Sequence, residues 1–337
     1  MQTNPGGRSP MRRLLLKSML ALPAAGALGL SGVSRAAQPY PSRPIRLVVP
    51  YAAGGGPDIQ TRKLAEVLAK QLGQPVVVEN KVGAGGILAA EFVAQQPADG
   101  YTLMLGASTH VTQKLLQPGA KFDPAAFTHI VRVGVSPAVL IVSAGSPYRT
   151  VADLVAAARR APGALNFASG GIGSAAHVSG AAFAAAAGID VVHVPYKGSV
   201  EIVPSLLKGD TQFGFPVATT ALPQLGAGKV RALAVTSASR AAALPQVPTL
   251  DEALGRKDLD LDAWSGVWAP PNLPAPIVVR LHAAILKALD DPGLRRLYTE
   301  MGAVIAPTPT PEAFSRLVAD ESARMRRVID KNRITIE

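Results

Sequence analysis

The chain has 337 residues, of which 48% are hydrophobic and 17% charged, and its formal net charge is +11. This length and composition suit about two globular domains. Cysteine is absent, which excludes disulfides, thiolate metal sites and cysteine nucleophiles. The five histidines are scattered without an H-x-x-x-H pair, so we expect no metal site and no cofactor.

The first 37 residues have the pattern of an export signal. A basic segment at 11–17 precedes an apolar run at 18–32, and residues 34–36 fit a small-x-small cleavage site. The apolar run is shorter than the ~20 residues of a membrane span. We therefore expect an exported protein of the periplasm that is cleaved near Ala36.

Two details of that signal stay open at the level of sequence. The segment M-R-R-L-L-L-K resembles a twin-arginine signal, and the general export route is the alternative. Translation begins at Met1 or at Met11, because residues 1–10 add nothing to the signal. Residues 38–337 contain 29 basic and 23 acidic residues and no basic run with interleaved aromatics, so we expect no nucleic-acid binding.

Beyond the signal, strand-like and helix-like segments alternate, which is typical of α/β units with parallel strands. The first part of the chain predicts strands at 45–49 and 75–79 and a turn followed by a third strand at 99–106. It also predicts helices at 58–72 and from the 80–86 turn to about 96. The second part predicts strands at 129–135, 138–143, 165–168, 190–194, 211–215 and 231–236, and helices at 151–161, 175–187, 198–208 and 218–226. Helices at 277–289 and 311–332 follow the segment 264–269.

These segments group into two similar α/β blocks, at about 38–137 and 138–236, each with Gly-rich turns between a strand and a helix. The tail 237–337 has no such turn, and we expect it to serve packing. We therefore predict an export signal at 1–37, a first lobe of 38–137 plus 237–337, and a second lobe of 138–236. Two chain crossings between the lobes would form a hinge.

The strongest candidate binding element is the Gly-rich turn 51–58, which follows an apolar strand. Its three glycines, 54–56, let the backbone approach a ligand, and the helix that begins at Pro57 adds a partial positive charge. The turn has the features of a small anion site, with a tight structural connection as the alternative. The acidic Asp58 is suited to stabilising the first helical turn or to contacting a ligand hydroxyl or water.

The second candidate is the turn Ser169–Ser174, again between a strand and a helix. It resembles the dinucleotide turn of short-chain dehydrogenases, but it lies far beyond the first strand, and Tyr196 and Lys197 are adjacent instead of spaced as Tyr-x-x-x-Lys. Ser174 lies outside a G-x-S-x-G elbow, and His177 shares its helical turn. We therefore expect neither an oxidoreductase nor a serine hydrolase, and we predict that Ser174 caps the helix, with ligand contact left open.

Further candidates follow the other strands, because ligands of open α/β sheets bind beyond the carboxyl ends of the strands. Ser108 and Thr109 end the third strand, where a hydroxyl donates to a ligand or caps the backbone. The turn at 80–86 is better interpreted as close helix packing than as binding. Tyr196 suits a pocket wall and lobe packing equally, and Lys197 is predicted to be solvated.

A series of motifs is shared with one protein family. In chain order they are P-I-R-L-V-V-P-Y-A-A-G-G-G-P-D, V-V-V-E-N-K-V-G-A-G-G, P-A-D-G-Y-T-L-M-L-G, L-N-F-A-S-G-G-I-G-S-A-A-H, V-P-Y-K-G, K-V-R-A-L-A-V-T-S, A-L-P-Q-V-P-T-L-D-E-A and W-S-G-V-W-A-P. With the export signal, this series resembles the substrate-binding proteins of tripartite tricarboxylate transporters, the Bug receptors. The resemblance covers nearly all of residues 43–310 in order.

The resemblance implies a type II periplasmic binding protein fold, in which two α/β lobes joined by a hinge enclose the ligand cleft. It implies a receptor, not an enzyme, which captures a small organic carboxylate for the permease subunits of a tripartite tricarboxylate-type transporter. One alternative is a receptor that signals to a two-component sensor kinase without a dedicated transporter, and another is an enzyme on the same fold. We expect a monomer.

In this family, backbone amides of two turns and ordered waters typically hold a carboxylate, and these turns map here to 52–58 and 169–174. Tyr51 stands where phenylalanine is usual. Phe215 is followed by Pro216 where many members carry an acid or an amide, which favours a dicarboxylate or an aromatic carboxylate without an amine. The predicted ligand-binding residues are Tyr51, Ala53, Gly54, Gly55, Asp58, Ser108, Thr109, Ser169, Gly173, Ser174, His177 and Tyr196.

Overall fold

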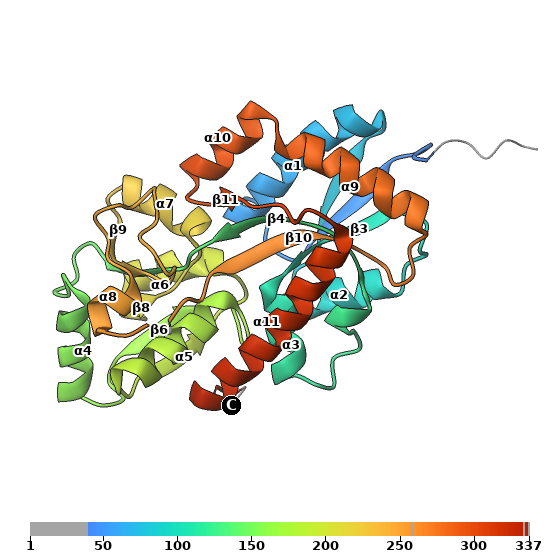
Figure 1. The fold of residues 1–337 in the computed structure, drawn as a ribbon. Coiled ribbons are helices and arrows are strands. Elements are labelled where there is room, and N and C mark those ends of the chain that lie inside the picture. The colour runs from blue at the N-terminus through green and yellow to red at the C-terminus, as the bar shows by residue number, and fades with distance from the viewer. Residues whose placement is uncertain (1–39, 258, 333, 336–337) are drawn as a thin grey trace, which may run out of the picture. The chain divides into compact units, whose positions relative to one another are not determined.

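The computed structural model describes residues 40–257, 259–332 and 334–335, and the export signal predicted at 1–37 lies outside them. Their strands fall into two sheets (Figure 1). The strand order is β11-β4-β10-β3-β1-β2 in the first sheet and β7-β6-β8-β5-β9 in the second. We refer to each sheet with its helices as a lobe. The α/β class predicted from the alternating segments is confirmed.

The first sheet is mixed. Its strands are β1 (Ile45–Val49), β2 (Val76–Asn80), β3 (Thr102–Ala107), β4 (Thr128–Ser136), β10 (Ala263–Ala269) and β11 (Val304–Ile305). β1 pairs in parallel with β2 and β3, whereas β10 is antiparallel to both β3 and β4, and β11 is antiparallel to β4. The prediction of parallel strands was therefore wrong for this part of the sheet. The tail of the chain inserts a central strand, not only surface packing.

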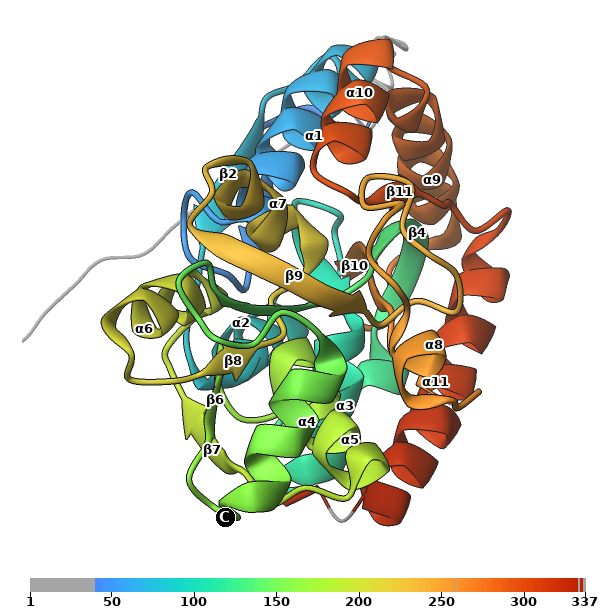
Figure 2. The same ribbon diagram turned by 90° about the vertical axis from the view of Figure 1, so that its left-hand side faces the viewer.

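The second sheet is mixed as well. Its strands are β5 (Val139–Ser143), β6 (Asn166–Ser169), β7 (Val192–Pro195), β8 (Phe213–Gly214) and β9 (Val230–Val235). β6 is parallel to β7 and β8, and β5 is antiparallel to β8 and β9. Figure 2 brings this sheet to the front, with helices α4, α5 and α6 around it.

The helices divide between the lobes. Those of the first lobe are α1 (Gly56–Leu72), α2 (Ile87–Ala94), α3 (Ser108–Leu116), α9 (Ala275–Leu289), α10 (Pro292–Glu300) and α11 (Pro311–Asn332), with the short 3₁₀ turns η1 (Ala84–Gly86) and η2 (Pro124–Ala126). Those of the second are α4 (Val151–Arg160), α5 (Ala175–Ala187), α6 (Ile202–Lys208), α7 (Ala218–Gly226) and α8 (Leu250–Leu254), with η3 (Ser199–Glu201). The predicted bounds of α5, α7 and α11 are confirmed, and α8 and α10 were not predicted.

Local sequence explains where the two central helices begin and end. Pro57 lies in the first turn of α1, where its missing N–H leaves no unpaired donor, and Gly73 ends the helix in the left-handed region at φ +69°. Ser174 caps α5 by accepting a hydrogen bond from the His177 N–H at 3.3 Å, and Gly188 ends that helix at φ +61°. Both helices therefore start immediately after a Gly-rich turn.

Apolar packing fixes the first sheet between two layers of helices. Leu47 belongs to the cluster shared with α1 and α9, while the next residue, Val48, belongs to the cluster shared with α2, α3 and α11. Such continuous apolar strands are expected of a sheet that is covered on both faces. The sheet is therefore rigidly supported up to the edge where its turns emerge.

The tail also packs against the second lobe. Leu250, Leu259 and Leu261 are buried in the same apolar cluster as the strands of the second sheet. Helix α11 begins beside the first sheet and runs past α3 toward α5 (Figure 1), so that Phe314 is buried in a first-lobe cluster and Met325 in the second-lobe cluster. The packing therefore does not change lobes at residue 237.

Candidate functional site

A cavity of about 120 Å³ lies where the turns that leave the two sheets meet. Its wall includes the turn after β1 at residues 50–57, the segment 82–86 after β2, and Thr109 after β3. From the second lobe it includes Gly170 and 174–176 after β6, and 197–200 after β7. A single water molecule needs about 10–15 Å³ of such space, so the cavity has room for a small organic molecule.

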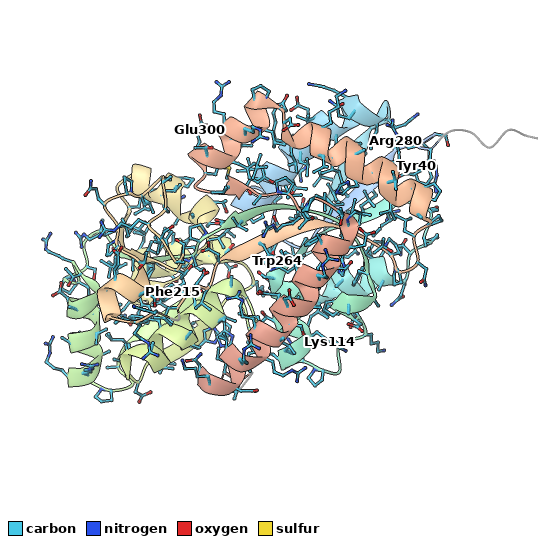
Figure 3. The ribbon with its side chains drawn as sticks, viewed as in Figure 1. Tyr40, Lys114, Phe215, Trp264, Arg280 and Glu300 are labelled. Carbon is cyan, nitrogen blue, oxygen red and sulfur yellow. The ribbon has the colours of Figure 1, made fainter. Side chains whose placement is uncertain are left out.

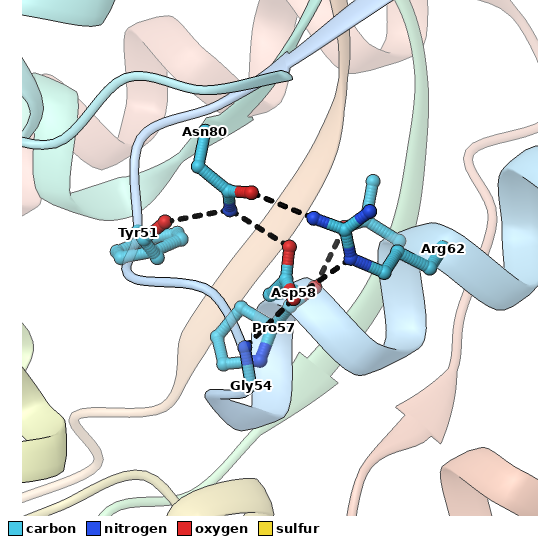
Figure 4. A network of polar contacts seen from close by, with 7 residues as sticks. Tyr51, Gly54, Pro57, Asp58, Arg62 and Asn80 are labelled. Carbon is cyan, nitrogen blue, oxygen red and sulfur yellow. Dashed lines mark hydrogen bonds and ion pairs between the residues drawn. The ribbon is translucent and has the colours of Figure 1, made fainter. Parts of the chain in front are cut away.

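The first turn is held by a buried carboxylate (Figure 4). Asp58 accepts hydrogen bonds from the Gly54 N–H at 2.8 Å, the Asn80 side-chain amide at 2.7 Å and the Arg62 guanidinium at 3.0 Å. Asn80 in turn donates to the Tyr51 carbonyl at 2.9 Å and accepts from Arg62 at 2.7 Å. The carboxylate is thus fully used in shaping the turn, in agreement with the stabilising role suggested for it.

The ionisation of Asp58 follows from the same network. Burial alone would raise the pKa of the Asp58 carboxyl, but the hydrogen bonds from Arg62, Asn80 and Gly54 outweigh it and lower that pKa below its ordinary value. The group is therefore an anion at neutral pH that is neutralised by its own turn. It therefore repels a bound anion less than an unpaired carboxylate would.

Close contact between the lobes occurs at the start of α1. A Cβ on Gly56 would lie 2.4 Å from the Thr219 hydroxyl oxygen of α7, so only glycine allows this approach. The N-cap residue Gly55 makes no side-chain cap hydrogen bond to the first amides of the helix. The N-terminal end of α1, where the helix dipole is positive, therefore lies at the cavity wall.

The second turn is held by neutral imidazoles. His177 accepts a hydrogen bond from the Gly173 N–H through Nδ1 at 3.0 Å. His193 lies 2.6 Å from the Ser169 hydroxyl through Nε2, and that hydroxyl oxygen accepts from the Gly171 N–H at 3.1 Å. The two rings stack with centroids 4.0 Å apart. Burial lowers the pKa of His177 to about 4, and burial and the neighbouring ring lower that of His193 to about 3.

A glutamine joins two of the Gly-rich turns. Gln113 of α3 donates from its side-chain amide to the Gly85 carbonyl at 3.4 Å and to the Ile172 carbonyl, and its own oxygen accepts from Gln117 at 2.7 Å. Gln113 is fully buried, and a Cβ on either Gly85 or Gly173 would collide with it. This side chain therefore connects the turn at 80–86 with the turn of the second lobe.

The predicted site residues divide into three groups. Tyr51, Gly55, Thr109 and Ser174 line the cavity. Asp58, Ser169, Gly173 and His177 are buried and hydrogen-bonded within the turns. The remaining four lie elsewhere in the same region and do not line the cavity: Ala53 and Gly54 on the exposed side of their turn, Ser108 in a small neighbouring cavity, and Tyr196 partly buried against the second-lobe core.

The local structure at Ser108 and Thr109 corrects the prediction. These residues do not end a strand but open helix α3, whose third residue, His110, accepts the Ala107 N–H through Nδ1 at 3.1 Å. β3 thus passes into a helix without a loop. The Thr109 hydroxyl is turned toward the Tyr51 hydroxyl, and burial raises the pKa of Tyr51 against the effect of that hydrogen bond.

Several cavity residues were not predicted. They include Gln60 and Thr61 of α1, Thr219 of α7, and the strand residues Ser136, Trp264 and Ser265. The turn at 82–86, which the sequence favoured as packing, lines the cavity too. Trp264 comes from β10, in the tail expected to serve packing only (Figure 3). A helical or strand pattern gives no signal that separates such residues from ordinary core residues.

Charge is nearly absent from the cavity wall. Among the lining residues within the described ranges, Lys197 is the one charged side chain, and it is exposed. The described residues contain no group of three or more histidine and acidic side chains that could hold a metal ion. No helix in the part of the chain that the structure covers is long and apolar enough to cross a membrane.

Comparison with known proteins places this geometry in a family. Residues 60–334 match the tripartite tricarboxylate transporter family receptor. The structure of the periplasmic binding protein BugD is similar with a TM-score of 0.82 at 32% identity, over 88% of this chain and 99% of that one.

Two solved structures from Rhodopseudomonas palustris are also similar. Rpa4515 with adipate has a TM-score of 0.84 at 34% identity, over 88% of this chain and 99% of that one. MatC with bound malate has a TM-score of 0.81 at 32% identity, over 86% and 100%. The chain belongs to the receptor family of the tripartite tricarboxylate transporters, and its two lobes have the fold of a periplasmic binding protein.

Proposed function

We propose that this chain is a periplasmic receptor that captures a small organic carboxylate between its lobes and delivers it to the membrane subunits of a tripartite tricarboxylate-type transporter. The observation that carries the proposal is the cavity wall, which combines turns and a helix N-terminus from both lobes with no acidic side chain among its described residues. The adipate and malate held by two relatives support the same ligand class.

The physical basis of capture is the backbone. The first amides of α1 have no side-chain cap, and the helix dipole favours an anion at this end. Gly170 and Ser174, at the two ends of the second turn, line the same cavity from the second lobe. A hydrogen bond to a charged group contributes about 1.5–3 kcal/mol. A few such bonds suffice for tight binding without a cation, and the exposed Lys197 has a secondary role.

The ligand itself is proposed to lack an amine. Pro216 and Val217 line the cavity after Phe215, where an acid or an amide could otherwise have met an ammonium group. A buried ammonium without a counter-charge would be strongly destabilised. A dicarboxylate or an aromatic carboxylate fits this wall better than an amino acid.

Closure follows from contacts with both lobes. A ligand that touches the turns of both lobes only when they are close together shifts the population toward that state. We assign 38–137 with 237–337 to one moving part and 138–236 to the other, except that α8 and the segment that packs with it, up to Leu261, move with the second lobe. The export signal at 1–37 is removed near Ala36. The protein acts as a monomer without catalysis, and transport is favoured over signalling to a sensor kinase because the family is described by its transporter.

The test of this function is Gly55→Val. A Cβ at this position would lie 3.3 Å from the Ala52 carbonyl oxygen and 3.5 Å from Val200 of the second lobe, so a branched side chain fills the space between the two turns. Calorimetry with adipate and malate should show binding to the wild type and none to the variant. Gly119→Val, at a position with open space around it, is the control and should bind normally. Unchanged affinity of Gly55→Val would contradict the proposed site.

A further inference from the structure

Three residues that line the cavity each carry a buried polar atom with no hydrogen-bond partner among the described residues. These atoms are Nε2 of Gln60, the hydroxyl oxygen of Thr219 and Nε1 of Trp264. Their residues are 7%, 3% and 5% exposed, respectively. A buried donor without a partner is unfavourable, so each of these groups calls for an explanation.

These groups belong to parts of the wall other than the two glycine turns. Gln60 lies one helical turn after Gly56 on α1, and Thr219 of α7 packs against Gly56 itself. Trp264 comes from β10, where its ring packs edge-on against Phe314 with centroids 5.5 Å apart. Elements of both lobes therefore supply the three groups, and none of them is needed to hold the turns that bind the first carboxylate.

The chemistry of the three groups selects their partner. The Gln60 amide nitrogen and the Trp264 indole donate only, and the Thr219 hydroxyl donates or accepts. No acidic side chain lines the cavity within the described ranges, so the wall offers donors without negative charge. Such a set matches an oxygen acceptor that carries charge, and it leaves an ammonium group unsatisfied.

We propose that Gln60, Thr219 and Trp264 form a second subsite, which binds the far carboxylate of a dicarboxylic acid whose first carboxylate is held by the glycine turns. This assignment rests on the proposed carboxylate-receptor function. It extends that function by naming the side chains that recognise the second carboxylate. Selectivity for a diacid over a monoacid then resides in these three neutral donors and not in a cation.

The chain provides matched controls for two of the three residues. Thr220 follows Thr219 on α7 and also has a buried hydroxyl without a partner, and Trp268 lies on β10 with an unpartnered indole nitrogen. Neither lines the cavity. Thr219→Val against Thr220→Val, and Trp264→Phe against Trp268→Phe, therefore remove the same atoms inside and outside the proposed subsite.

Calorimetry should compare straight-chain diacids from succinate to suberate with the monoacids of equal length. We expect Thr219→Val and Trp264→Phe each to weaken the best diacid about tenfold and to change the monoacid less than about twofold, with both controls near wild type. Gln60→Leu should behave like the first two. Circular dichroism and thermal unfolding of each variant establish that it is folded before affinities are compared.

The outcomes separate this inference from the function on which it rests. If Gly55→Val abolishes binding of both acid types while Thr219→Val and Trp264→Phe leave diacid affinity unchanged, the receptor proposal stands and the subsite is overturned. Equal losses for diacid and monoacid would also overturn it, because the three groups would then act through packing. If the wild type binds none of these acids, the receptor proposal fails and the subsite fails with it.

Discussion

The glycine turns of the two lobes perform the same task with opposite chemistry. The turn after β1 is shaped by an ionised carboxylate, Asp58, which draws in a backbone N–H, an amide and a guanidinium. The turn after β6 is shaped by His177, which accepts the Gly173 N–H through an unprotonated Nδ1, and by the neutral ring of His193 at the Ser169 hydroxyl. The turn after β1 therefore keeps its shape only while Asp58 is deprotonated. The turn after β6 keeps its shape only while the histidines are neutral.

This difference shows how the receptor keeps both turns in place at neutral pH. The hydrogen bonds around Asp58 lower its pKa, and burial lowers the pKa of both histidines, so each group is well inside its working protonation state. Neither device leaves a net charge in the wall that would repel or capture an anion by itself. The backbone amides then remain as the groups that discriminate between ligands.

The largest effect that separates the two turns should come from Asp58→Ala. The change removes the acceptor of the Gly54 N–H, together with the ion pair to Arg62 and one hydrogen bond from Asn80, which both keep another partner. Leaving a buried hydrogen-bonding group unpaired costs about 1–3 kcal/mol. Urea unfolding should show this loss of free energy, and calorimetry should show that adipate binding is abolished.

The control for that variant is Glu66→Ala on the same helix. Glu66 pairs with Lys63 and Lys70 at the surface, where solvent screens ion pairs, so its removal should leave the free energy of unfolding close to that of the wild type. Equal effects of the two substitutions would show that the Asp58 network does not hold the turn.

A smaller effect should come from acid through the second turn. Histidine in the unfolded chain has a pKa of about 6.5, whereas His177 titrates at about 4 in the folded protein, so the unfolded state binds more protons between these values. The free energy of unfolding should therefore fall as the pH drops from about 6.5 toward 4. Asp58 stabilises the folded protein as an anion, because its pKa is lowered by folding. Its contribution to the free energy of unfolding is lost only as the pH falls below about 4.

Replacement of one imidazole isolates this contribution. His177→Phe keeps an aromatic ring beside His193 but removes the acceptor of the Gly173 N–H, and we expect about a tenfold loss of ligand affinity at pH 7.5. The slope of unfolding free energy between pH 6.5 and 4 should be shallower than in the wild type, where His110 and His129 also contribute because burial lowers their pKa values to about 4. An unchanged slope would contradict a lowered pKa of His177 in the folded protein.

The smallest effect should come from Gln113, whose side chain connects the turn at 80–86 with the turn of the second lobe. Gln113→Ala removes the hydrogen bond to the Ile172 carbonyl and should weaken adipate binding about threefold to tenfold, through a less favourable approach of the lobes. Gln117→Ala removes only the contact to the Gln113 oxygen, so it should change affinity less than about twofold. If both variants bind alike, the glutamine does not couple the turns.

The parts of the fold that were predictable have local causes. Helix α5 was delimited at both ends because Ser174 caps it and Gly188 stops it. The position of β10 had no such signal, since a strand at 263–269 finds its place between β3 and β4 only through pairing with residues more than a hundred positions earlier. Helix α3 was missed because β3 passes into it directly at Ser108, without a turn residue to mark the change.

The candidate site was predictable to the same extent. The glycines of both turns predict that the backbone there can come close to a ligand. In the structure, residues of both turns line one cavity. The role of His177 beneath its turn, and the presence of Gln60, Thr219 and Trp264 in the wall, depend on which way a buried side chain faces. A helical or strand pattern states that a residue is buried, but not whether it meets the core or a cavity.

The central claim is that backbone amides of the two glycine turns, and not a cationic side chain, hold the ligand carboxylate. A crystal structure of the mature protein with adipate tests it most directly. The account predicts carboxylate oxygens about 3 Å from backbone nitrogens at both turns, 54–58 and 170–175, with the Lys197 amine farther away. A carboxylate paired chiefly with Lys197, or lying away from both turns, would contradict it.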